Sequence, residues 1–189
     1  NSTIQAAITD GRLVDHETPW NGIRVVPAHL GLTFDKGATL PPLANDVDLA
    51  IVDCPPDMTS PSIRAALLVS NFVVSPIDPE AFGSQSVVSL QRALHDVGIA
   101  HNPALRFLGL LLNRRERLSV HNAIEDVLRR LHGGMVFDTV VPSLAAFKES
   151  AAIRKPVTQY QPKGKAADVV RALADEVFSR IEKSAKKAA

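Results

Sequence analysis

Short apolar runs that stop abruptly at polar residues or prolines alternate with helical periodicity along this chain. Three such runs, at 48–53, 72–77 and 108–112, are largely apolar, which is typical of strands buried on both faces of a parallel sheet. Each run ends at a proline or a polar pair, and proline cannot continue a central strand. The pattern predicts an α/β fold with an open, mostly parallel sheet and flanking helices.

Helices are predicted where apolar residues recur every three or four positions. The segment 84–97 is expected to be a helix that ends at Gly98, a plausible C-cap. A helix at 119–132 and a last helix at about 165–184 each carry one apolar stripe that should face the core. The stripes are Val120, Ile124, Val127 and Leu131 in the first, and Val170, Leu173, Val177 and Ile181 in the second.

Weaker signals mark the remaining elements. Thr59 or Ser60 can cap a helix that has Pro61 in its first turn. Residues 3–9 are expected to form a short helix, 23–26 a strand, and 35–47 a loop with a helical turn. The tail 184–189 is small and basic and should fray.

Composition favours one compact domain over residues 1–189, with 46% hydrophobic and 5% aromatic residues. The formal net charge of +1 gives no global field for nucleic acid, so any such binding must come from a local patch. The single cysteine, Cys54, excludes an internal disulfide, fits a reducing compartment and is expected in the core. No apolar run is long enough to span a membrane.

Asp53 is the first candidate site residue, because it should stand at the carboxyl edge of the sheet, where open α/β folds bind ligands. A carboxylate there suits a Mg²⁺ ion that carries phosphates, directly or through water. An aspartate that caps the turn after a strand is an equally good interpretation at this stage.

The order of several short motifs resembles the ParA family of deviant Walker ATPases, which includes the Soj-type partition proteins and the MinD branch. The resemblance runs from about Ile23 to Ile181 and implies a P-loop NTPase-like fold. Its motifs are Asp53-Cys54-Pro55-Pro56, Pro76-Ile77-Asp78-Pro79-Glu80, the strand before Asn113, Val140-Val141-Pro142-Ser143, and Arg154-Lys155-Pro156-Val157.

This resemblance implies ATP and Mg²⁺ as cofactors and gives three residues nucleotide roles. Asp53 aligns with the aspartate that holds Mg²⁺ through water, and Asn113 with an asparagine placed against adenine. A side-chain amide offers a donor and an acceptor, which suits the adenine edge, although a turn-forming role is an equal alternative. Pro142 aligns with a proline whose neighbourhood packs on the base.

The family's phosphate-binding loop has no counterpart in these 189 residues. Such a loop needs glycines for close backbone approach, then Lys and Ser/Thr. Gly164-Lys165-Ala166 lacks both the upstream glycine and the hydroxyl. We therefore expect that the first strands and the catalytic residues are absent here. The chain alone should not hydrolyse ATP, although its parent protein should.

For the parent, the resemblance implies a homodimer on ATP that binds DNA without sequence preference, a ParB-like stimulating partner, and a cytoplasmic, nucleoid-associated location. Two arginines usual in the family's DNA contacts are replaced by Ser143 and Ala146. The candidate DNA-binding residues are the clustered basic residues Arg115, Arg117, Lys148, Arg154 and Lys155. They either bind DNA phosphates or form a solvated face.

Two other function classes stay open. A MinD-like positioning ATPase on a membrane would need bulky apolar residues in a C-terminal amphipathic helix, and 182–187 has none. A non-catalytic ParA-like dimerisation module is favoured by the missing phosphate loop and disfavoured by Asp53 and Asn113.

Overall fold

The computed structural model describes residues 16–20, 22–27, 40, 47–55, 60–79 and 84–188. The chain divides into two units, residues 1–71 with 88–105 and residues 72–87 with 106–189. The helix expected at 3–9, nearly all of the loop expected at 35–47, and the alternative cap Thr59 lie outside the described residues.

The first unit contains a small hairpin and helix α2. Strand β1 (His16–Glu17) pairs antiparallel with β2 (Arg24–Val25), which is the strand expected at 23–26. Helix α2 (Pro61–Val69) begins as expected, because the Ser60 hydroxyl accepts the N–H of Ser62 and Pro61 occupies the first turn. Its buried face consists of Ile63, Ala65, Ala66 and Leu67.

Helix α3 (Ser84–Ala100) runs past the glycine that was expected to end it. Gly98 has no left-handed φ, so it does not act as a C-cap. The chain turns instead where the N–H groups of His101 and Asn102 both donate to the Val97 carbonyl. The Asn102 amide then donates to the carbonyls of Leu67 and Ser70, at 2.8 Å each, and fixes the end of α3 to α2.

The prediction of a buried strand at 48–53 is wrong. None of residues 47–55, all of which are described, belongs to a strand, and Ile51 is 86% exposed. Cys54, expected in the core, is exposed as well. An apolar run becomes a buried strand only when neighbouring strands accept its backbone hydrogen bonds, and this run forms no such ladder.

The second unit is built on two parallel strands, β3 (Phe72–Ile77) and β4 (Arg106–Leu112), which confirms the α/β class with a parallel sheet. After the short helix η1 (Gly133–Met135), residues 136–142 run parallel beside β4 and form bridges from Val136 to Leu110 and from Pro142 to Arg115. The described sheet of this unit therefore has a short, irregular third row on the β4 side.

Helix α4 (Ser119–His132) buries a different face from the one expected. Its buried residues are His121 and Leu128, whereas Val120 is 55% and Leu131 66% exposed. His121 Nδ1 accepts the backbone N–H of Glu116 at 3.0 Å, which anchors the start of the helix. Periodicity identified the residues that share a face, but not the face that is covered.

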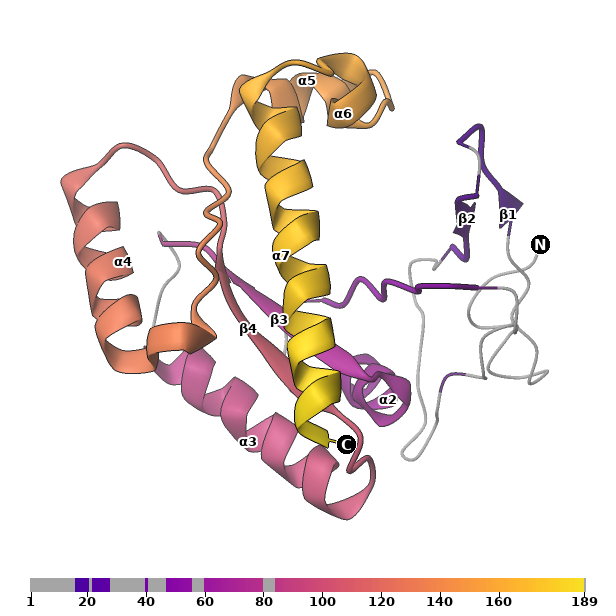
Figure 1. Cartoon of the computed structure of the whole chain (residues 1–189), viewed down its shortest axis with the longest axis vertical. Helices are drawn as coiled ribbons and strands as arrows, with labels where there is room; N and C mark the ends of the chain where they lie inside the picture. The colour runs from indigo at the N-terminus through magenta and orange to yellow at the C-terminus, as the bar shows by residue number, and fades with distance from the viewer. Residues whose placement is uncertain are drawn as a thin grey trace. The chain divides into compact units, whose positions relative to one another are not determined.

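Three helices complete the second unit: α5 (Ala145–Ala152), α6 (Val157–Tyr160) and α7 (Lys165–Ala188). Helix α7 lies along β4 (Figure 1). Its stripe is confirmed for Leu173, Val177 and Ile181, which pack on the buried cluster of Leu108, Leu111 and Phe137. Residues 184–188, expected to fray, continue the helix. Within the described ranges, no helix is both long and apolar enough to cross a membrane.

Candidate functional site

Asn113 stands at the point where the parallel sheet of the second unit ends. Its backbone N–H donates to the Ile77 carbonyl at 2.8 Å, so β3 and β4 terminate together. The residue is half-buried, and within the described ranges its side-chain amide has no hydrogen-bonding partner. The carboxyl edge of the sheet therefore presents an unused NH₂ group, with two N–H donors, and an unused carbonyl oxygen acceptor.

Pro142 is held beside this point by the row that runs along β4. The Val141 N–H donates to the Leu112 carbonyl at 2.9 Å, and the Arg115 N–H donates to the Val141 carbonyl at 3.0 Å. Ser143 N–H closes the ladder on the Arg115 carbonyl at 3.0 Å. The structure thus brings Asn113 and Pro142 onto one edge.

Arg114 links the ends of β3 and β4 through its side chain. Its Nη1 lies 3.4 Å from Asp78 Oδ2. Its φ of +55° is the left-handed conformation, which is uncommon for a residue with a side chain. A backbone outlier that follows directly on Asn113 marks this turn as a site where the surrounding contacts dictate the conformation.

Arg115 is engaged within the protein rather than displayed to solvent. Its Nε lies 3.6 Å from Glu125 Oε2, and its Nη2 donates to Asn122 Oδ1. Glu125 also pairs with Arg129 at 3.0 Å, and Arg129 lies 3.9 Å from Asp138. The side chain of Arg115 therefore belongs to a ladder of alternating charges that runs along α4.

The other four candidate phosphate-binding residues, Arg117, Lys148, Arg154 and Lys155, are exposed. Lys148 lies on α5, and Arg154 and Lys155 lie in the turn that follows it, where Arg154 has a φ of +52°. The loop before α4 and the α5–α6 pair lie at the same end of β4 (Figure 1). Arg117 belongs to the first of these segments, and Lys148, Arg154 and Lys155 belong to α5 and the turn that follows it.

Asp53 belongs to the first unit, where its carboxylate is exposed. Although Cys54 is exposed as a residue, partial desolvation of its thiol and then the charge of Asp53 raise the pKa of that thiol. Among the described residues, no group of three or more His, Cys, Asp or Glu side chains is arranged to hold a metal ion. A single exposed carboxylate is compatible with a Mg²⁺ ion bound mainly by water and phosphates.

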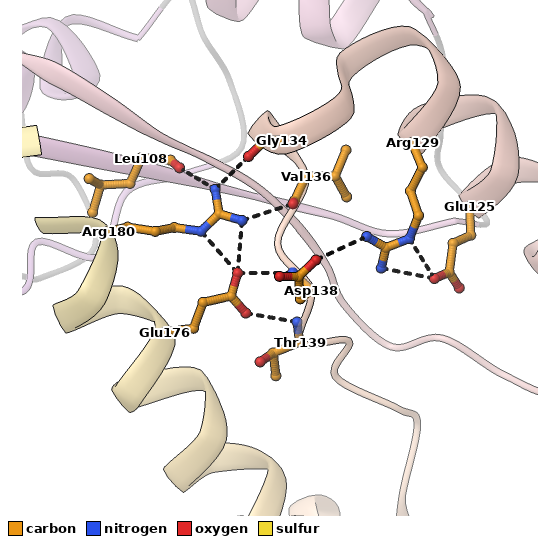
Figure 2. A network of polar contacts seen from close by, with 9 residues as sticks. All are labelled: Leu108, Glu125, Arg129, Gly134, Val136, Asp138, Thr139, Glu176 and Arg180. Atoms are coloured by element: carbon orange, nitrogen blue, oxygen red, sulfur yellow. Dashed lines mark hydrogen bonds and ion pairs between the residues drawn. The ribbon is translucent and has the colours of Figure 1, made fainter. Parts of the chain in front are cut away.

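The sequence reasoning missed a polar pair on α7, Glu176 and Arg180 (Figure 2). Glu176 accepts the backbone N–H groups of Asp138 and Thr139 at 2.9 and 2.8 Å. Arg180 Nη2 pairs with Glu176 at 2.8 Å, and its guanidinium lies 4.1 Å from the centre of the Phe137 ring. A signal was present, because both residues follow Leu173 at the spacing of the core stripe.

These contacts shift the pKa of the Glu176 carboxyl group. Burial acts to raise its pKa, but the hydrogen bonds from the Thr139 and Asp138 backbones and from the Thr139 and Arg180 side chains outweigh it. The net effect is a lowered pKa for Glu176.

Comparison with known proteins agrees with this architecture, although no protein-family model matches the chain. The chromosome-partitioning ATPase Soj of Thermus thermophilus is 33% identical over 138 residues, which cover 72% of this chain and 55% of that protein. The chromosome partitioning protein ParA of Myxococcus xanthus is 27% identical over 195 residues, covering 94% of this chain and 69% of that protein. The match to the Thermus protein therefore spans little more than half of that relative.

A solved structure shares the fold. The crystal structure of cobyrinic acid a,c-diamide synthase from Mycobacterium smegmatis matches with a TM-score of 0.55 and 22% identity, over 71% of this chain and 48% of that one. The parallel sheet, its flanking helices and its polar carboxyl edge define a P-loop NTPase-like α/β protein. Together with the partition relatives, they show that the chain belongs to the ParA/MinD superfamily.

Proposed function

We propose that the full-length protein is a ParA-like partition ATPase, an ATP-driven dimer switch that binds DNA without sequence preference. The observation that carries the proposal is the 33% identity to a chromosome-partitioning ATPase over 72% of this chain. The edge formed by Asn113 and Pro142 supports it, because both positions implied by the resemblance meet at one end of the sheet.

In this proposal Asn113 and Pro142 hold the adenine base. The Asn113 amide meets the donor and acceptor of the adenine edge, and the Pro142 segment packs on the ring face. The amide fits this role because it is half-buried and has no partner among the described residues. Guanine presents the reversed donor–acceptor pattern on the corresponding edge, so selectivity requires that the rest of the site fixes the orientation of the amide.

Asp53 would hold Mg²⁺ through water, the role that the resemblance gives it. Bound Mg²⁺ neutralises the charge that develops on the phosphates during hydrolysis. This chain would contribute the exposed Asp53 carboxylate, which could accept hydrogen bonds from water molecules bound to the ion. We also propose that residues 1–189 alone are inactive, because no phosphate-binding motif occurs among them.

DNA binding in this proposal comes from Arg117, Lys148, Arg154 and Lys155, all exposed around the carboxyl edge. Arg115 contributes through the conformation of the loop, because its guanidinium is engaged with Glu125 and Asn122. A ParB-like protein is the proposed partner that stimulates hydrolysis, and the proposed location is the cytoplasm at the nucleoid.

The direct test is Mg²⁺-dependent ATP hydrolysis by the full-length protein with DNA present. Asp53→Ala should lower turnover at least about tenfold, because the metal loses its protein anchor. Asp48→Ala, which removes an exposed carboxylate from the same segment, is the matched control. A full-length protein without ATPase activity would point instead to the non-catalytic interaction module.

A further inference from the structure

The row beside β4 contains an interruption next to Pro142. Phe137 N–H donates to the Leu110 carbonyl at 2.8 Å, and Val141 N–H donates to the Leu112 carbonyl at 2.9 Å. The row therefore advances four residues while β4 advances two, whereas a regular parallel ladder advances equally on both sides. The two extra residues leave backbone N–H groups that β4 does not accept.

Glu176 accepts two of these N–H groups from the other side. Its Oε1 receives the N–H of Asp138 at 2.9 Å, and its Oε2 receives the N–H of Thr139 at 2.8 Å. One carboxylate thus replaces two ladder acceptors, and both of its oxygens are used (Figure 2). Hydrogen bonds to a charged acceptor are stronger than those between neutral groups, which suits an irregular segment.

Arg180 fixes the orientation of this carboxylate. Its Nε and Nη2 both reach Glu176 Oε1, at 2.9 and 2.8 Å. Its remaining donors bind the carbonyls of Leu108, Gly134 and Val136 at 2.8–2.9 Å. Arg180 therefore joins β4, η1 and the start of the row to the same turn of α7, and its side chain is only 16% exposed.

The geometry assigns a positioning role to Glu176 and Arg180: we infer that this pair sets the register of the 138–142 segment and thereby the placement of Pro142 against the nucleotide base. Val141 and Pro142 follow Asp138 and Thr139, the two residues whose N–H groups Glu176 clamps, by two to four positions. Only Val140 lies between Thr139 and the next ladder bond. A change in the clamp is therefore transmitted to the Pro142 backbone without a flexible linker. The inference rests on the proposed nucleotide site.

The test compares base selectivity in full-length variants. Dissociation constants for Mg²⁺-ATP and Mg²⁺-GTP are measured for the natural protein, Glu176→Gln and Arg180→Lys. Both variants should lower the preference for ATP over GTP at least about fivefold, because a shifted Pro142 no longer fits adenine better. A purely structural role would lower stability and leave the ratio of the two constants unchanged. Glu182→Gln, which removes an exposed carboxylate from the same helix, is the matched control and should keep the natural ratio.

A second measurement needs no variant. If the clamp influences base binding, bound base must stabilise the clamp by the same factor, because coupling is reciprocal. Saturating ATP should therefore slow hydrogen exchange of the Asp138 and Thr139 amides at least about fivefold in the natural protein. Unchanged exchange at both amides, or an unchanged ATP/GTP ratio in folded variants, would overturn the positioning role alone. A natural protein that binds neither nucleotide would overturn the proposed function as well.

Discussion

The backbone N–H of Asn113 donates to the carbonyl of Ile77 at 2.8 Å, which joins the residue after β4 to the last residue of β3. This bond places a polar side chain directly at the edge where parallel sheets bind ligands. The segment 136–142, which contains Pro142, pairs with the same edge from the β4 side. The candidate base site therefore depends on how β3, β4 and the segment 136–142 are aligned with one another.

Replacing Gly109 should lower the stability of the protein, because this glycine lies where the β3–β4 register shifts. Its φ is +146°, and a Cβ there would meet the Met135 carbonyl, with Arg180 Nη1 at 3.0 Å and Phe137 Cδ2 at 3.1 Å. Gly109→Ala should cost about 2–3 kcal/mol of unfolding free energy, from strain and overpacking. Gly134→Ala is the control, because open space surrounds that position. Equal urea midpoints for the two variants would contradict the close approach.

Stability should depend on acid through Glu176. Because the folded-state pKa of Glu176 is lowered, its stabilisation is complete above its ordinary value of 4.5 and is lost as the pH falls below that value. Glu176→Gln should therefore flatten the loss of stability with acid, measured as urea midpoints between about pH 3 and pH 7. Glu182→Gln should keep the natural slope, and a natural slope in Glu176→Gln would show that other groups control acid unfolding.

DNA binding by the ATP-loaded protein should weaken steeply with salt, because phosphate contacts release counterions. Each alanine substitution at Arg117, Lys148, Arg154 or Lys155 should weaken binding equally across sequences and lower the salt slope by about one. Fluorescence anisotropy with two unrelated duplexes gives both quantities. Undiminished binding after loss of all four charges would place the DNA surface elsewhere.

Arg115→Ala should behave differently from those four substitutions. Because Arg115 pairs with Glu125 and Asn122, its loss should lower the unfolding free energy by about 1–2 kcal/mol. Arg117→Ala, two residues away and exposed, should change stability by less than about 0.5 kcal/mol. Thermal unfolding of the two variants distinguishes the internal arginine from the exposed one.

The sequence predicted well those features that depend on local chemistry. Ser60 and Pro61 start α2 because cap and first-turn preferences act within one helical turn. Leu173, Val177 and Ile181 are on the covered face because α7 packs on the sheet along its length. Asn113 and Pro142 reach one edge because parallel strands place their carboxyl ends together.

Features that depend on partners distant in sequence were not predictable in this way. The run 48–53 has the composition of a buried strand, yet no strand ladder includes it. Val120 and Leu131 share a face with Ile124, but the covered side of α4 is the one that carries His121. Glu176 resembled an ordinary surface carboxylate, because the two N–H groups that it accepts arise from an irregular row 37 and 38 residues away.

The most direct test of the account is calorimetric titration of the full-length protein and its Asn113→Ala variant with Mg²⁺-ATP. The account predicts saturable binding by the natural protein and an affinity about tenfold lower in the variant, because the base loses one paired donor and acceptor. Asn71→Ala, an exposed asparagine just before β3, should leave the affinity unchanged. Equal affinity in natural protein and Asn113→Ala would contradict the placement of the base at this edge.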